Sequence, residues 1–176
     1  VVYQIYPKSY YDSHGDGIGD LAGITEKLDY IQSLGTNVIW LCPIFKSPMK
    51  DNGYDIADYS VVDPIFGDNK ALDKLISEAK KRDIKILLDL VLNHSSDEHP
   101  WFKAALDDPN SPYAGYYIFK QWDKPTPPNN LRTYFDCSVW SRVGNTDRWY
   151  FNSFGPEQPD LNWENPQLRK DIIDMI

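Results

Sequence analysis

Cysteine, long apolar runs and blocks of one charge are all scarce in this sequence, and each scarcity excludes a class of protein. The chain has two cysteines, Cys42 and Cys137, too few for a disulfide framework and typical of a reducing compartment, so we expect the cytoplasm. No apolar stretch approaches the length of a membrane span, so we expect no membrane contact. Acidic and basic residues are interspersed at a net charge of −8, which predicts no nucleic-acid partner.

The first half of the chain alternates between strand-like and helix-like segments. Its helix-like segments carry apolar residues three and four positions apart, as in Leu21, Ile24 and Leu28, and Gly35 supplies a helix stop. Its last strand-like segment is a near-continuous apolar run, typical of a parallel strand covered on both faces. The expected order is strand 1–6, helix 21–35, strand 37–41, helix 71–82 and strand 84–92. This order predicts an α/β fold built from β-α-β units.

The second half of the chain has a different character. From residue 95 to residue 159, prolines, glycines and polar residues interrupt short aromatic pieces, which indicates an inserted, loop-rich subdomain. The run TPPNN, residues 126–130, cannot be helical and marks a tight connection. A final helix is expected from residue 165, with Pro166 in its first turn and an apolar stripe of Leu168, Ile172, Ile173 and Ile176.

The stretch DSHGDGIGD is the first candidate for chemistry. Side-chain oxygens stand at positions 1, 5 and 9, which are Asp12, Asp16 and Asp20, and Gly17 stands at position 6, as in an EF-hand loop. Position 12, however, is Gly23, where an EF-hand has a bidentate Glu. The local pattern therefore leaves two interpretations open, a cation-binding loop and a solvated acidic turn.

Four segments together resemble the α-amylase (glycoside hydrolase) family, most closely its oligo-1,6-glucosidase and α-glucosidase branch. They are VVYQIYPKSYYDSHGDGIGDLAGITEKLDYIQSLG, GTNVIWLCPIFKSPMKDNGYDIADY, DLVLNHSSDEHPWF and QPDLNWENP. They follow one another in the family's order and extend over essentially the whole chain. Agreement between several separate motifs is more specific than any one of them.

The resemblance implies a partial TIM (β/α)8 barrel. A complete barrel takes about 250 residues, and this chain of 176 would supply three strand–helix steps and an insertion. The implied division is barrel 1–94, inserted subdomain 95–164 and the next barrel helix from residue 165 to 176. In the family, the nucleophilic Asp, the acid/base Glu and the stabilising Asp follow later strands, beyond these residues. We therefore expect no catalytic residue in this chain, and no hydrolysis by the chain alone.

What the resemblance does assign here is the sugar-binding part of the site. Asp51 matches the residue that hydrogen-bonds the hydroxyls of the non-reducing-end glucose, Tyr54 matches its stacking platform, and His94 matches a histidine that contacts the same sugar. Asp89 matches an acidic residue that supports the site near the nucleophile. By themselves, His94 and Tyr54 would more often be structural residues of a core, and the motif context favours the sugar-binding interpretation.

Two weaker matches come from the insertion. Phe135, in FDCSVW, is expected to line the sugar pocket, and Gln158 is expected near its rim. The family usually has glycine or another small residue where Asp136 and Cys137 stand, so the chain departs from the family pattern at this point.

The resemblance also implies a calcium ion in the first loop. Its ligands would be Asp12, His14, Asp16, the carbonyl of Ile18 and Asp20. The family has Asn at position 14, and a histidine nitrogen is a poorer calcium ligand than an amide oxygen, so reduced affinity is expected.

The implied function is retaining hydrolysis of α-1,4 or α-1,6 glucosidic bonds in oligosaccharides or starch-derived glucans. A phosphorylated disaccharide is a neighbouring possibility, and the residues that choose among these substrates lie beyond residue 176. The alternative is a non-catalytic scaffold with the same fold, such as the ectodomain of an amino-acid transporter heavy chain. The presence of Asp51, Tyr54, Asp89 and His94 favours the enzyme, because a scaffold needs no sugar pocket. An incomplete barrel would also leave strand edges unpaired, which predicts self-association of the chain.

Overall fold

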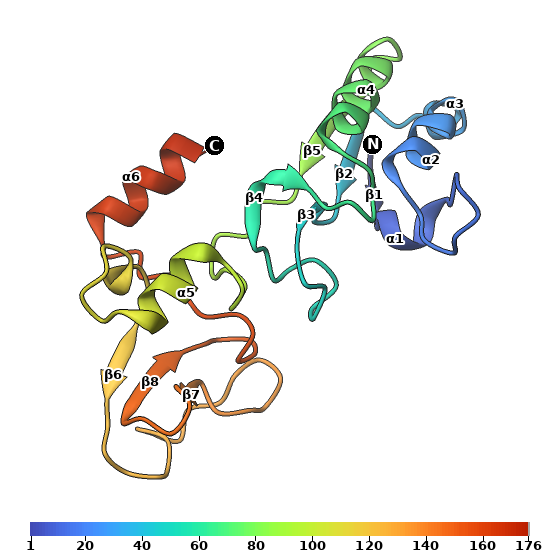
Figure 1. Ribbon diagram of the computed structural model, residues 1–176. Helices are drawn as coiled ribbons and strands as arrows, with labels where there is room; N and C mark the ends of the chain where they lie inside the picture. The colour runs from blue at the N-terminus through green and yellow to red at the C-terminus, as the bar shows by residue number, and fades with distance from the viewer. Residues whose placement is uncertain (176) are drawn as a thin grey trace. The chain divides into compact units, whose positions relative to one another are not determined.

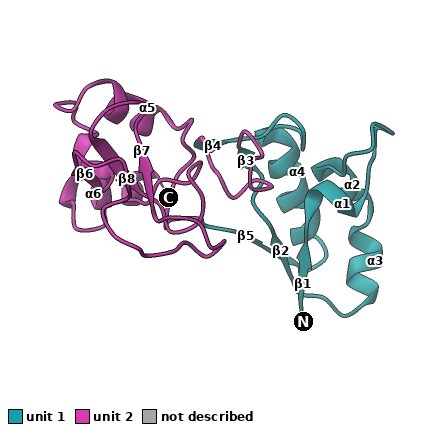
Figure 2. Ribbon diagram, turned by 90° about the horizontal axis from the view of Figure 1, so that it is seen from below, with its two compact units in different colours: residues 1–46, 58–90 teal, residues 47–57, 91–176 magenta. Residues whose placement is uncertain are grey.

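The computed structural model of the protein describes residues 1–175, which form two compact units (Figures 1 and 2). Unit 1 contains residues 1–46 and 58–90, and unit 2 contains residues 47–57 and the chain from residue 91 onward. Ile176, expected in the apolar stripe of the last helix, lies outside the described residues. Within residues 1–175 no helix has the length and apolar character that crossing a membrane requires.

Unit 1 is built on a parallel sheet of three strands in the order β1-β2-β5 (Figure 1). In its register, Val38 of β2 pairs with Val2 of β1 and with Lys85 of β5. The elements of the unit are β1 (Val2–Ile5), α1 (Pro7–Tyr10), α2 (Leu21–Glu26), α3 (Leu28–Ser33), β2 (Val38–Leu41), β3 (Phe45–Lys46), β4 (Asp58–Val62), α4 (Asn69–Lys80) and β5 (Lys85–Leu88). The predicted order of strands and helices and their parallel arrangement are confirmed.

The helices of unit 1 bury the apolar residues that the spacing indicated. Leu21, Ile24, Leu28 and Ile31 are fully buried. The expected single helix 21–35 is divided at Lys27, whose backbone leaves helical geometry between α2 and α3. Gly35 follows α3 at φ +74°, the left-handed conformation of a helix stop.

Strand β5 is shorter and less covered than its sequence indicated. It ends at Leu88, and the side chain of Leu87 is 52% exposed. β5 and β1 are the two outer strands of the described sheet, so each has one edge without a neighbouring strand in it.

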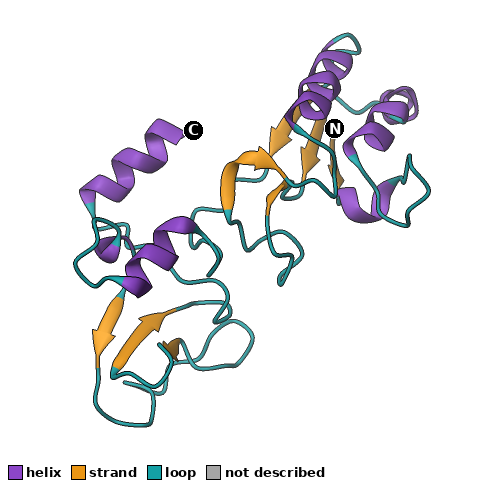
Figure 3. Cartoon of the chain, viewed as in Figure 1, coloured by secondary structure: helices purple, strands orange, loops and turns teal. Residues whose placement is uncertain are grey.

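Unit 2 combines helices with a small antiparallel sheet of order β6-β8-β7 (Figure 3). Its elements are α5 (Pro100–Asp107), a 3-10 turn (Ala114–Tyr116), β6 (Phe119–Gln121), β7 (Trp140–Arg142), β8 (Arg148–Phe151) and α6 (Pro166–Met175). Aromatic residues fill much of its core, where Phe102 contacts Tyr117 and Tyr150 edge to face. Leu168 and Ile172 attach α6 to this core, as their spacing predicted, whereas Ile173 is exposed.

Segment 47–57 belongs to unit 2, although it lies in the sequence between two parts of unit 1. Hydrogen bonds attach this segment to the second half of the chain, for example from the Ser96 N–H to the Ile56 carbonyl at 2.8 Å. The barrel and subdomain boundaries at residues 94 and 164 stay a prediction.

Candidate functional site

The loop of residues 47–55 is organised around the buried carboxylate of Asp55. This carboxylate accepts hydrogen bonds from the Ser47 hydroxyl at 2.9 Å, the Asp51 N–H at 3.0 Å and the Lys50 N–H at 3.0 Å. The loop passes through the left-handed backbone conformation at Asn52 (φ +52°). This conformation costs free energy, and the hydrogen bonds to Asp55 stabilise the loop that contains it. Asp55 thereby fixes the backbone from which the Asp51 side chain projects.

His94 is joined to the same loop. Its Nε2 lies 3.0 Å from the Tyr54 carbonyl, which can only accept, so this nitrogen carries the proton. Its Nδ1 lies 3.2 Å from the side-chain nitrogen of Asn93 and can accept from it. Burial lowers the pKa of His94, against the opposing effects of the hydrogen bond to the Tyr54 carbonyl and then of the nearby carboxylate of Asp160. The imidazole is therefore neutral and has a fixed orientation.

Gln158 lies next to both Asp51 and His94. Its amide nitrogen donates to the Asp51 carboxylate at 2.8 Å and lies 3.1 Å from His94 Nε2. The side chain is fully buried, so Gln158 does not occupy the rim where the sequence analysis expected it. Its amide oxygen is buried and has no hydrogen-bond partner among residues 1–175. An unpaired buried acceptor is costly, which marks this atom as a place for a ligand donor.

Asp160 lies next to His94 and is hydrogen-bonded to neighbouring residues. Its buried carboxyl group accepts from the N–H of Ser153 at 2.8 Å, from the Ser153 hydroxyl and from the Asn93 amide at 3.2 Å. An isolated antiparallel bridge also pairs Asp160 with His94. Burial raises the pKa of Asp160, and the hydrogen bonds from Ser153 oppose this rise.

Aromatic rings adjoin the polar residues. The ring of Phe154 lies 5.1 Å from that of His94, and the rings of Tyr134 and Phe135 lie 6.0 and 6.3 Å from Phe154. Phe135, expected at the pocket, is thus joined to His94 through Phe154, a residue that the sequence analysis did not single out. Its only signal in the sequence was membership of the aromatic piece RWYFNSF.

The two remaining predicted site residues, the sugar-binding Tyr54 and the supporting Asp89, lie in different units. Tyr54 lies in unit 2 and is half-buried, and its carbonyl is the partner of His94. Asp89 lies in unit 1, directly after β5, and its N–H donates to the Leu41 carbonyl at 3.2 Å. Unit 2 therefore brings together Asp51, Tyr54, His94, Phe135 and Gln158, while Asp89 stands at the carboxyl end of a parallel strand, where α/β folds place their chemistry.

The first loop shows how its acidic residues are used within the chain. The Asp12 carboxylate accepts backbone N–H groups from Gly15 at 2.6 Å and Gly17 at 2.7 Å. Asp20 caps helix α2 through the N–H of Gly23 at 2.6 Å, and its second oxygen lies 3.0 Å from His14 Nδ1. Across residues 1–175, no three His, Cys, Asp or Glu side chains converge as a metal site would require. In this arrangement each carboxylate oxygen of Asp12 and Asp20 accepts a hydrogen bond from a backbone N–H of residues 13–23.

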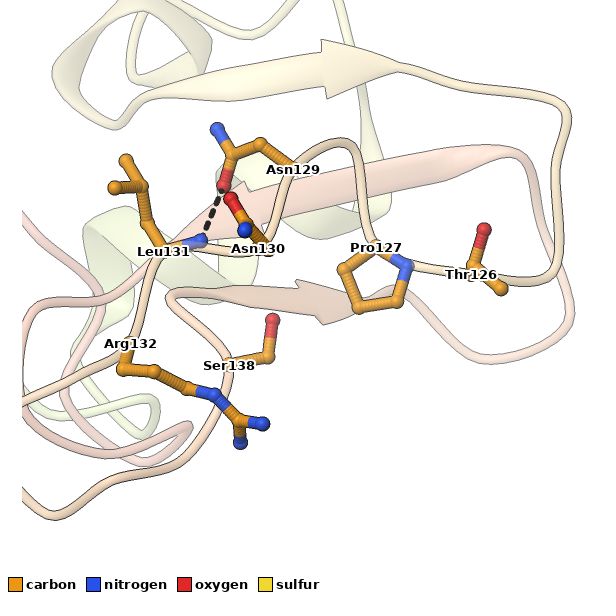
Figure 4. Close-up of a pocket in the computed structure, with 7 residues that line it drawn as sticks. All are labelled: Thr126, Pro127, Asn129, Asn130, Leu131, Arg132 and Ser138. Carbon is orange, nitrogen blue, oxygen red and sulfur yellow. Dashed lines mark hydrogen bonds between the residues drawn. The ribbon is translucent and has the colours of Figure 1, made fainter.

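A separate pocket of about 530 Å³ lies in the connection between β6 and β7 (Figure 4). In it the Asn129 side-chain oxygen accepts from the Leu131 N–H at 3.1 Å, and Arg132 donates to the Asp136 carbonyl at 3.1 Å. Its lining residues are Thr126, Pro127, Asn129, Asn130, Leu131, Arg132 and Ser138. None of them is a predicted sugar-binding residue.

The parallel strand–helix steps of unit 1, with polar side chains following the strands, define an α/β protein. A protein-family model described as "Alpha amylase, catalytic domain" matches residues 4–176 of the chain. The chain is 52% identical to a glucan 1,6-alpha-glucosidase of Streptococcus pneumoniae and 51% identical to an oligo-1,6-glucosidase of Heyndrickxia coagulans. Each alignment covers 100% of this chain and 32% of the relative. The chain therefore belongs to the α-amylase family.

A solved structure agrees with this assignment. Trehalose-6-phosphate hydrolase of Bacillus licheniformis matches with a TM-score of 0.94 and 46% sequence identity, over 99% of this chain and 32% of that one. The predicted fold class, a partial (β/α)8 barrel, is confirmed. The chain spans about a third of the length of the curated relatives that it matches.

Proposed function

We propose that the protein carrying this chain hydrolyses α-glucosidic bonds in short glucans with retention of configuration, and that this chain holds the glucose at the non-reducing end. The named activities of its relatives, glucan 1,6-alpha-glucosidase and oligo-1,6-glucosidase, support this proposal. The substrate would be an α-linked oligosaccharide.

The observation that carries the proposal is the convergence of Asp51, His94 and Gln158. These side chains come from segments up to 107 positions apart, and within unit 2 Gln158 donates to the Asp51 carboxylate while its amide nitrogen lies 3.1 Å from His94 Nε2. Together they offer a carboxylate, a neutral imidazole and a buried amide oxygen without a partner. A sugar hydroxyl can donate to the carboxylate and the amide oxygen, and a ring carbon face can pack on an aromatic side chain.

Bond cleavage would need groups outside this set. Retaining hydrolysis requires two carboxyl groups about 5 Å apart, one as nucleophile and one as acid/base. The family resemblance places both beyond residue 176. We therefore propose that residues 1–176 alone do not cleave glycosides, and that Asp89 supports the nucleophile in the complete protein.

The test is kinetic and uses the protein at its natural length. Asp51→Asn keeps the shape of the side chain and removes its charge, so kcat/KM for isomaltose is expected to fall about tenfold to a hundredfold, the cost of weakening one charged hydrogen bond. Asp123→Asn, at an exposed position, is the matched control and is expected to leave kcat/KM unchanged.

A non-catalytic scaffold gives a different result in the same experiment. A wild-type protein that neither binds glucose nor cleaves isomaltose, maltose or trehalose 6-phosphate would contradict the proposal and favour the scaffold. Equal activity of wild type and Asp51→Asn would retain the enzyme and reject the role of Asp51.

Two further properties are proposed with this function. The first is a structural calcium ion held by the ligand set that the resemblance implies, Asp12, His14, Asp16, the Ile18 carbonyl and Asp20; the oxygen-rich part of this donor set supports it. The second is a cytoplasmic location, supported by two free cysteines, which are typical of a reducing compartment.

A further inference from the structure

Two exposed aromatic side chains lie next to the candidate sugar site. The side chain of Tyr134 is 83% exposed and that of Phe135 is 55% exposed. Their rings meet edge to face at 5.7 Å, and both approach Phe154. Exposed aromatic surface of this kind is unfavourable in water and commonly marks a binding surface.

The backbone that carries these rings is held in one conformation. Residues 133–137 form a tight turn in which the Thr133 hydroxyl accepts from the N–H groups of Phe135 at 3.2 Å and Cys137 at 3.1 Å. The turn passes through left-handed backbone at Asp136, φ +63°, and the Arg132 guanidinium donates to the Asp136 carbonyl. A ring presented by a fixed turn loses little freedom when a ligand binds.

The turn is also hydrogen-bonded to Ser153, which is bonded in turn to Asp160, the β-bridge partner of His94. The Tyr134 N–H donates to the Ser153 carbonyl at 2.9 Å, and the Ser153 N–H donates to the Asp160 carboxylate at 2.8 Å. In addition, Phe154 packs on both His94 and Tyr134. The exposed ring of Tyr134 is therefore positioned by the same framework that positions His94.

We propose that Tyr134 is the stacking platform for a second sugar unit of an α-linked oligosaccharide whose first unit occupies the site of Asp51, His94 and Gln158. This inference rests on the proposed function. The carbon face of a pyranose ring is apolar and flat, which suits an exposed phenol ring, and the phenol hydroxyl can contact the sugar hydroxyls at its edge. Tyr134 would then favour oligosaccharides over glucose.

The experiment compares ligands of increasing length on the natural-length protein. Tyr134→Ala is expected to raise KM for isomaltose and isomaltotriose about three- to tenfold, the usual effect of one aromatic contact, while the inhibition constant for glucose stays unchanged. Tyr134→Phe keeps the ring and is expected to restore most of the affinity. Leu131→Ala, at a position 56% exposed, is the matched control for loss of exposed apolar surface and is expected to behave as wild type.

Cys137 provides a second readout. It is exposed in the same turn, whereas Cys42 is buried, so iodoacetamide is expected to modify Cys137 first. Isomaltotriose is expected to slow this alkylation, followed by mass spectrometry of the modified peptide, and glucose is not. Tyr134→Ala should abolish the protection by isomaltotriose.

The outcomes separate the two proposals. A wild-type protein without glucose affinity or turnover would overturn the proposed function itself. A wild-type protein that binds glucose, with Tyr134→Ala weakening glucose and isomaltotriose equally or weakening neither, would retain the proposed function and overturn the role of Tyr134.

Discussion

His94 lies near three carboxylates, yet burial keeps it neutral. In the unfolded chain, His94 becomes protonated near pH 6.5, the usual pKa of a histidine. In the folded chain its pKa is lowered, so His94 becomes protonated only at a lower pH. The unfolded state therefore gains protons first, and the free energy of unfolding is expected to decrease as the pH falls below 6.5.

His94→Gln should remove the share of this pH dependence that belongs to His94. Urea denaturation at pH 5, 6 and 7 measures the effect, and NMR titration of the imidazole protons assigns it. A His94 pKa above 6.5, or an identical pH dependence in the variant, would contradict the expectation.

At His14, a single ring nitrogen stands where the proposed metal needs an oxygen. His14→Asn is expected to raise calcium affinity about tenfold or more, because an amide oxygen replaces a nitrogen and frees the Asp20 oxygen that now lies 3.0 Å from the ring. Calorimetric titration with calcium measures this, and Asp16→Ala serves as the variant that should not bind. If neither wild type nor His14→Asn binds calcium, the first loop is an acidic turn.

Among the elements, the loop 47–55 depends most visibly on one side chain. Asp55→Ala would leave the N–H groups of Lys50 and Asp51 and the Ser47 hydroxyl without their acceptor, which is expected to lower the free energy of unfolding by about 2–4 kcal/mol. Chemical denaturation of both proteins measures the difference.

The matched control for Asp55 is Asp123→Ala, since an exposed substitution is expected to change stability by less than about 0.5 kcal/mol. A similarly small effect of Asp55→Ala would mean that the loop is held by other contacts.

Local periodicity made the elements of unit 1 predictable. The three- and four-residue spacing of Leu21, Ile24 and Leu28 indicates a helix with one buried face. Patterns of this kind predict the order of strands and helices in unit 1 correctly. The break at Lys27 depends on packing, which neighbouring residues do not encode.

Only those residues of the candidate site that lie in a recognised sequence motif could be predicted. Asp51, Tyr54, His94, Phe135 and Gln158 were expected from the resemblance, and unit 2 does bring them together. The supporting roles of Asp55, Phe154 and Asp160 were not anticipated, and neither was the burial of Gln158. Each depends on side-chain contacts formed on folding, which the sequence pattern does not reveal.

For the whole molecule, the sheet of unit 1 carries the prediction of self-association. Strands β1 and β5 each have an outer edge without a neighbour in the described sheet, and such edges pair readily with another chain. Light scattering of residues 1–176 at increasing concentration is expected to show a rising mean mass. A constant monomer mass over the whole range would contradict this.

The path of the chain between the two units bears on how the protein emerges from the ribosome. All three strands of the unit 1 sheet are available once Leu88 has been synthesised, whereas Asp51 must wait for Gln158, 107 positions later. Long-range contacts of this kind form after local ones. During translation, segment 47–57 therefore passes through a period in which its partners in the second half of the chain have not yet been synthesised.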